Sequence, residues 1–112
     1  MIGEIDHIYY WVRDMGAAVA FYRDVLALPL VRRDGDEWAE FDAGPVRLAL
    51  HGGGPSSPAS GTAVFRVRDL DAARMVLADR GAEIDEHVGE VEGFARFATV
   101  RDPDGNPVQL IE

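Results

Sequence analysis

Two stretches of seven residues decide the fold, because they are nearly the same. Residues 12–18 read VRDMGAA and residues 67–73 read VRDLDAA, which gives five identities at a spacing of 55 positions. A second similarity lies near the end of each half, where PVRL at 45–48 matches PVQL at 107–110. A repeat spaced by about half of a 112-residue chain indicates that one structural unit occurs twice.

Each half contains the pattern of a strand, a helix and three further strands. Residues 5–13 and 62–68 are rich in aromatic and β-branched side chains, which is typical of strands. Asp14 and Asp69 then stand in the N-cap position ahead of apolar residues at helical spacing. The sequence therefore predicts an α+β fold of two tandem βαβββ modules. The remaining strand candidates are residues 30–33, 37–41 and 46–50, and residues 83–87, 95–100 and 108–111.

The two modules are expected to form one domain over residues 1–112. They occupy residues 1–51 and 61–112, and a loop rich in Gly, Ser and Pro joins them over residues 52–60. The segment DPDGN at 102–106 carries two carboxylates, but Pro and Gly stand where a tight turn needs them. We therefore predict a hairpin turn there and not a catalytic pair.

The composition excludes several kinds of chemistry. The chain has no Cys, so it has no disulfide, no thiolate nucleophile and no Cys-ligated zinc or iron–sulfur cluster. All 11 basic residues are Arg, so a Schiff base on a lysine is also excluded. A net charge of −9 without a basic cluster argues against binding to nucleic acid or to an anionic membrane. We expect a small-molecule ligand, and a cytoplasmic location because no signal or membrane segment is visible.

The duplicated plan and its segments resemble the vicinal oxygen chelate superfamily, which includes glyoxalase I, extradiol dioxygenases, fosfomycin-resistance enzymes and bleomycin-resistance proteins. The resemblance is carried by DHI at 6–8, AFYRDVL at 20–26 and FATVRDPDGN at 97–106. It implies a cupped mixed β-sheet with the helices on its outer face, and it implies a homodimer. Ala27 departs from the pattern, since relatives often have Gly after the first helix, and we expect a conformational cost there.

The resemblance also implies four positions where metal-dependent members place their ligands. These positions are His7, Arg47, Thr62 and Gln109. Of these, His7 is a good ligand, whereas Arg stays protonated and offers no lone pair, and a stable site usually needs three His or carboxylate ligands. We therefore expect no metal cofactor at these positions. An alternative divalent-metal site would combine His7, His51 and Glu112.

Strand alternation predicts which other side chains line the cup. Counting in steps of two from the four positions adds residues on the same face of each strand, and Trp38 is a further candidate from the third strand. Together they form an aromatic cavity with a few polar groups, which is the usual composition of a small-molecule site. The candidate ligand-binding residues are His7, Tyr9, Trp11, Trp38, Arg47, His51, Thr62, Arg66 and Gln109.

Two of these predictions have a plain structural alternative. The alternative for Tyr9 and Trp11 is that they are half-exposed strand residues or lie in a dimer interface. The alternative for Arg47 is an ion pair with Glu40 or Asp42 in place of a contact with a ligand.

Three functions are compatible with these residues. The first is a metal-free protein that binds or sequesters an aromatic or oxygen-rich compound in the cup, similar to the bleomycin-resistance proteins. The second is a lyase, isomerase or dioxygenase, in which His7 is the general base and Arg47 stabilises the developing oxyanion, with or without a metal. The third is a domain that binds another protein. The incomplete set of metal ligands favours the first.

Overall fold

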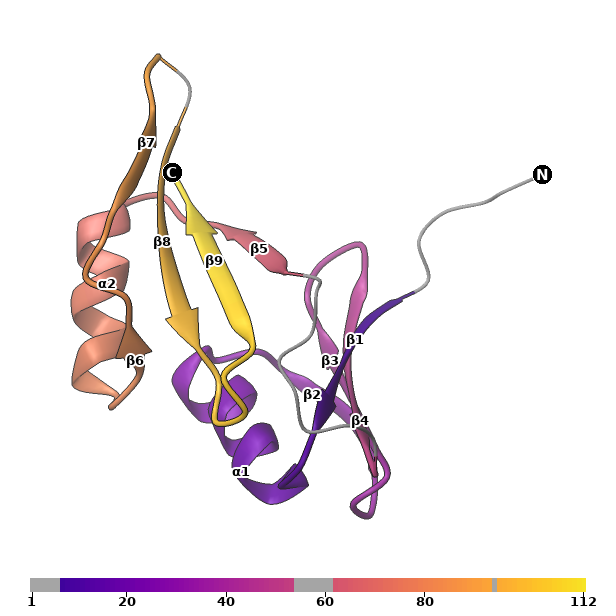
Figure 1. The fold of residues 1–112 in the computed structure, drawn as a ribbon. Helices are drawn as coiled ribbons and strands as arrows, with labels where there is room; N and C mark the ends of the chain where they lie inside the picture. The colour runs from indigo at the N-terminus through magenta and orange to yellow at the C-terminus, as the bar shows by residue number, and fades with distance from the viewer. Residues whose placement is uncertain (1–6, 54–61, 94) are drawn as a thin grey trace.

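Each half of the chain forms a sheet of its own. The computed structural model describes residues 7–53, 62–93 and 95–112, and Figure 1 shows how the strands and helices are arranged. The first sheet has the order β1-β4-β3-β2 and consists of β1 (His7–Val12), β2 (Leu30–Asp34), β3 (Trp38–Asp42) and β4 (Arg47–Gly52). The second has the order β5-β9-β8-β6, with β7 paired to β8, and consists of β5 (Ala63–Arg66), β6 (Glu83–Ile84), β7 (Gly89–Val91), β8 (Ala95–Arg101) and β9 (Pro107–Ile111).

Both sheets are mixed. β1 runs parallel to β4 and β5 runs parallel to β9, whereas the other paired strands are antiparallel. This arrangement confirms the predicted α+β fold. One detail differs, because the strand expected at 83–87 ends at Ile84 and β7 follows as an additional short strand. Of the expected linker over 52–60, Gly52 still belongs to β4, and residues 54–60 lie outside the described residues.

The repeated Asp of the two motifs caps the two α-helices. α1 (Met15–Ala20) starts after Asp14, whose side chain accepts a hydrogen bond of 3.0 Å from the backbone N–H of Ala17. α2 (Leu70–Asp79) starts in the same way after Asp69. Each cap satisfies a backbone donor that the helix N-terminus leaves without a partner, so VRD marks the passage from a strand into a helix. No helix within the described ranges is long and apolar enough to cross a membrane.

The first helix ends in a wide turn that the sequence does not predict. η1 (Phe21–Val25) continues α1 as a π-helical turn, and the chain then passes through Ala27, whose φ is 59°. A positive φ brings the Cβ of a non-glycine residue close to the following carbonyl oxygen, so the conformational cost expected at Ala27 is present. Its neighbours Leu26 and Leu28 are half-buried and pack against the core.

We expect Ala27→Gly to stabilise the protein. Glycine adopts a positive φ without steric cost, and this gain exceeds the entropy that glycine adds to the unfolded chain, which leaves about 1 kcal/mol. Urea unfolding followed by circular dichroism measures the difference. Ala43→Gly is the matched control, because Ala43 does not have a positive φ, and it should not stabilise. An Ala27→Gly protein no more stable than the wild type would contradict the strain at this position.

One apolar core joins the helices and both sheets. Alternate side chains of the central strands are buried on the helix-bearing face, as Tyr10 in β1 and Val108 in β9 illustrate. Tyr10 also connects the modules, because its hydroxyl donates to the carbonyl of Pro107 over 3.0 Å and accepts from the N–H of Ala63. The modules therefore pack against each other through the faces that carry the helices.

The segment DPDGN at 102–106 forms the predicted turn and also fastens the second module to the first. The Asp102 carboxylate is almost completely buried and accepts hydrogen bonds from the Tyr22 hydroxyl, from the Asn106 side chain and from two backbone N–H groups within the turn. The Asn106 side chain also donates to the carbonyl of Trp11. The closing turn of the second module is thus bonded to η1 and to the end of β1.

Burial shifts the protonation equilibria of this network. Burial removes water from the Asp102 carboxyl and raises its pKa, although hydrogen bonds from Asn106 and Tyr22 oppose that shift. Burial, together with the Asp102 charge, raises the pKa of Tyr22 well above its ordinary value of 10.0. Burial raises the pKa of Tyr10 as well. Both hydroxyls therefore stay protonated in the folded protein at pH values where tyrosines of the unfolded chain ionise.

We expect the free energy of unfolding to fall above about pH 10 and Tyr22→Phe to reduce that fall. A pKa raised in the folded state gives stability that is complete below the unfolded pKa and is lost as the pH rises through the folded pKa. The chain has no lysine, so tyrosine side chains dominate titration in this range. Urea unfolding at about pH 8 and about pH 11 measures the effect.

At the lower pH Tyr22→Phe should be about 1 kcal/mol less stable, because it loses the hydrogen bond to Asp102. Between the two pH values it should lose less stability than the wild type. Tyr9→Phe is the control, since Tyr9 is exposed, and it should follow the wild type. The same pH dependence in Tyr22→Phe and wild type would show that Tyr22 is not responsible.

Candidate functional site

A cluster of aromatic rings occupies the face of the first sheet opposite the helices. Strand pairing places Trp11 of β1 beside His51 of β4, and His51 beside Trp38 of β3. His7 and Tyr9 lie on the same face of β1, because side chains two residues apart point to the same side of a strand. Five residues form this aromatic cluster: His7, Tyr9, Trp11, Trp38 and His51.

The rings of the aromatic cluster contact one another and remain partly open to solvent. His51 is central: its ring centroid lies 4.1 Å from that of Trp11, 5.4 Å from that of Trp38 and 5.9 Å from that of Tyr9. His7 packs edge-on against Trp38, with 5.5 Å between the centroids. Tyr9 is 45% exposed, whereas Trp11, Trp38 and His51 are half-buried. The cluster therefore presents ring faces and edges to solvent.

Hydrogen bonds fix two of these rings. The indole N–H of Trp38 donates to Oε1 of Glu40 over 2.8 Å. Nδ1 of His51 lies 2.8 Å from the carbonyl oxygen of Gly52, and a carbonyl can only accept, so the neutral ring carries its proton on Nδ1 and Nε2 is the acceptor. Glu40 was not predicted to support the site. The sequence feature that could have identified Glu40 is its position two residues after Trp38, on the same face of β3.

Arg47 stands next to the aromatic cluster at the start of β4. Strand pairing places it beside His7 on one side and beside Asp42 on the other. Its side chain is exposed, and no carboxylate in the described part of the chain forms an ion pair with it. The structure therefore does not show the alternative pairing with Glu40 or Asp42, and the guanidinium is accessible to a ligand.

The other three predicted residues lie apart from the aromatic cluster. Arg66 in β5 and Gln109 in β9 belong to the second sheet, and Thr62 directly precedes β5. Among the residues with described placement, no ring contact or hydrogen bond joins these three to the tryptophans of the cluster. Thr62 and Arg47 both line a cavity of about 380 Å³ between the modules. One chain thus carries the rings on one sheet and Arg66 with Gln109 on the other.

Comparison with known proteins agrees with this architecture. The family model of the Glyoxalase/Bleomycin resistance protein/Dioxygenase superfamily matches residues 4–110, which is nearly the whole chain. The chain belongs to this superfamily. The resemblance inferred from the duplicated modules and their segments is confirmed.

Solved structures of other proteins in this group share the fold. A lactoylglutathione lyase from Agrobacterium tumefaciens is 25% identical, with a TM-score of 0.83 over 99% of this chain and 94% of that one. A fosfomycin resistance protein from Listeria monocytogenes is 18% identical, with a TM-score of 0.83 over 99% and 93% of the two chains. A glyoxalase/bleomycin resistance protein/dioxygenase from Nocardioides is 21% identical, with a TM-score of 0.80 over 99% and 83%. No curated protein matches the sequence.

The residues of one chain do not fit a divalent metal of the kind that the resemblance implies for metal-dependent members. Arg47 holds one of the four ligand positions and cannot coordinate a cation. In the alternative set, Glu112 follows β9 on the second sheet and pairs with Arg96 at 3.3 Å, whereas His7 and His51 lie on the first sheet. Over residues 7–53, 62–93 and 95–112, no group of three or more His, Asp or Glu side chains is placed to hold a metal ion.

We expect Glu40→Ala to release the Trp38 indole and Glu40→Gln to retain it. The amide oxygen of Gln accepts the same hydrogen bond, whereas Ala removes the acceptor. Glu40→Ala should lower the free energy of unfolding by about 1 kcal/mol and shift tryptophan emission to the red. Urea unfolding and fluorescence spectra measure both effects, with the exposed Glu37→Ala as the control. A Glu40→Ala protein with wild-type emission and stability would contradict this role of Glu40.

Proposed function

We propose that this superfamily member is a cytoplasmic small-molecule-binding protein that holds a planar aromatic or oxygen-rich compound on the aromatic cluster without a divalent metal. The observation that carries the proposal is the cluster itself, since rings from three strands lie in contact on one partly open face. Exposed apolar groups that gather in one place are typical of binding surfaces. The donor set, which does not fit a metal, supports a metal-independent mode.

The groups around the cluster favour a ligand that combines a ring with oxygen atoms. The tryptophan rings stack against planar rings, and each such contact contributes about 1 kcal/mol beyond the area that it buries. Nε2 of His51 accepts a hydrogen bond from a hydroxyl group, and the exposed guanidinium of Arg47 binds carboxylate or carbonyl oxygens. A hydroxylated aromatic acid would use all three kinds of contact.

A second copy of the chain completes the site in this proposal. Arg66 and Gln109 of the partner subunit would face the aromatic cluster if its second sheet covered the first sheet of this chain. The edge strands support a homodimer, because Ile8 in β1 is 41% exposed and Val64 in β5 is 52% exposed. Dimer formation would remove this apolar surface from water, which favours association.

The alternative function is a lyase, isomerase or dioxygenase, and one observation favours it. His7 and Arg47 are paired across β1 and β4, so a general base and a cation lie at neighbouring positions. Such a pair suits proton abstraction next to a carbonyl group: the imidazole accepts the proton, and the guanidinium stabilises the charge that develops on the oxygen.

We expect saturable quenching of tryptophan fluorescence by hydroxylated aromatic carboxylates in buffer that contains EDTA, with catechols and planar aromatic cations as comparison classes. Trp11 and Trp38 are the two tryptophans, and both belong to the aromatic cluster, so a ligand bound there changes the emission. Tyr9→Ala should weaken binding about fivefold, because it removes one ring contact. Val31→Ala is the control, since Val31 is an exposed residue of β2 outside the cluster.

Several outcomes decide between the functions. The absence of saturable quenching by any of the three classes would contradict binding at the cluster. Binding that requires added nickel, zinc, manganese or iron(II) would contradict the metal-independent mode. Chemical conversion of the bound aromatic compound that is lost in His7→Ala would instead support the enzymatic function. Analytical sedimentation of the same samples should show a dimer. A monomer that binds the aromatic carboxylate with full affinity would contradict a site shared between two subunits.

A further inference from the structure

The two polar groups that flank the aromatic cluster are far apart along β4. Arg47 begins this strand, His51 lies near its end, and both side chains are on the open face of the first sheet. His51 follows four residues after Arg47, and each residue of a strand advances the chain by about 3.3 Å, so their Cα atoms are about 13 Å apart. Strand side chains stand roughly perpendicular to the sheet, so the guanidinium and the imidazole are anchored at this separation.

The rings of β1 occupy the distance between these two groups. The register of the strands places Arg47 beside His7 and His51 beside Trp11. Tyr9 stands between, with its ring centroid 6.1 Å from that of His7 and 5.7 Å from that of Trp11. The three rings of β1 therefore form a continuous row along the strand. A guanidinium that folded toward the imidazole would cover this row, which is the surface that an aromatic ligand needs.

The two ends of this row offer opposite kinds of polar group. The Arg47 guanidinium at the first end forms no ion pair with a described carboxylate. A second arginine on the same face, Arg32, is neutralised by Asp34 at 2.6 Å. At the other end, Nε2 of His51 accepts hydrogen bonds, and the carboxylate of Glu40, which is bonded to the neighbouring indole, disfavours a second anion. One end thus suits an anion and the other a hydrogen-bond donor.

We propose that the aromatic cluster selects an elongated aromatic acid that has two rings in line, a carboxylate at one end and a hydroxyl group at the other. The proposal rests on the function proposed above and adds the length and the polarity of the ligand. The carboxylate binds Arg47, the rings lie along the row from His7 to Trp11, and the hydroxyl group donates to Nε2 of His51. A single benzene ring covers roughly half of the distance of about 13 Å, whereas two rings in line cover most of it.

An acid with one ring reaches only one of the two polar groups at a time. An acid with two rings in line reaches both, so it gains a second ring contact and a hydrogen bond. Each of these two contacts increases the affinity about fivefold. The gain requires that the hydroxyl group and the carboxylate are at opposite ends, because only then does the hydroxyl group meet the imidazole.

Calorimetric titration of the wild-type chain with three acids tests length and polarity separately, in EDTA and at about pH 8, where imidazoles are neutral. The probes are 4′-hydroxybiphenyl-4-carboxylate, its isomer 3-hydroxybiphenyl-4-carboxylate, and 4-hydroxybenzoate. The isomer has both polar groups on one ring. The 4′-hydroxy acid should bind about fivefold more tightly than the 3-hydroxy isomer, which cannot reach His51. It should bind about twentyfold more tightly than 4-hydroxybenzoate, which also lacks the second ring.

Two variants assign the ends of the ligand to their partners. His51→Phe keeps a ring beside Trp11 and removes the acceptor, so it should lower the affinity for the 4′-hydroxy acid to that for its isomer and leave the isomer unchanged. Arg47→Gln should lower the affinity for both biphenyl acids about fivefold, as expected for one exposed ion pair. Arg23→Gln is the matched control, because Arg23 is exposed on η1 on the helix-bearing side, and it should bind as the wild type does. Circular dichroism verifies that each variant is folded.

The three titrations of the wild type decide the proposal without any variant. Equal affinities for the two biphenyl isomers would overturn the end-to-end polarity, and equal affinities for the 4′-hydroxy acid and 4-hydroxybenzoate would overturn the length. Either result would leave binding at the aromatic cluster intact. An affinity for the 4′-hydroxy acid that neither variant lowers would also overturn the proposal. If none of the three acids binds, the function proposed for the cluster fails as well.

Discussion

The buried carboxylate of Asp102 keeps the two modules in one arrangement. It accepts a hydrogen bond from the Tyr22 hydroxyl, and the turn that contains it also bonds to the backbone of Trp11 through Asn106. Because a buried carboxylate is costly without such donors, the closing turn of the second module has to remain against the first module. Tyr10 bridges the same interface. As a consequence, the two sheets meet through their helix-bearing faces.

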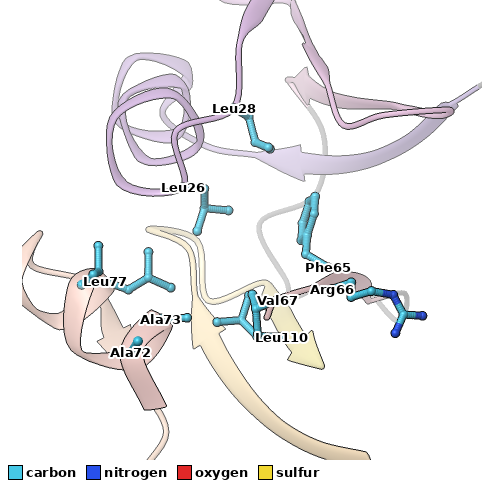
Figure 2. A pocket seen from close by; sticks show the side chains of 10 residues that line it. Leu26, Leu28, Phe65, Arg66, Val67, Ala72, Ala73, Leu77 and Leu110 are labelled. Carbon is cyan, nitrogen blue, oxygen red and sulfur yellow. The ribbon is translucent and has the colours of Figure 1, made fainter. Parts of the chain in front are cut away.

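This packing determines what each side of the molecule offers. The aromatic cluster lies on the open face of the first sheet, where Glu40 and the carbonyl of Gly52 hold Trp38 and His51. An apolar groove lies on the helix-bearing side of the second sheet (Figure 2), where Val76 and Leu77 stand in the places that Phe21 and Tyr22 occupy in the first module. The duplication thus produced two halves with the same backbone plan and different surfaces.

Features that depend on neighbouring residues could be predicted from the sequence. The VRD repeats predict the capped starts of α1 and α2, and DPDGN predicts its turn. Alternation along β1 and β4 predicts that His7, Tyr9, Trp11 and His51 share one face. Alternation assigns a side chain to a face of its strand but does not orient two sheets relative to each other. The separation of Arg66 and Gln109 from the cluster therefore could not be predicted, nor could the support that Glu40 gives to Trp38. The π-helical turn η1 has no local sequence signal.

Fluorine NMR of protein labelled with fluorotryptophan tests metal-independent binding at the aromatic cluster most directly. The chain has two tryptophans, so two resonances are expected, and Trp38→Phe assigns them. An aromatic carboxylate bound at the cluster should shift both resonances in the presence of EDTA, because Trp11 and Trp38 both contact His51. Resonances that stay in place at saturating ligand, or that move only after a divalent metal is added, would contradict metal-independent binding at this site.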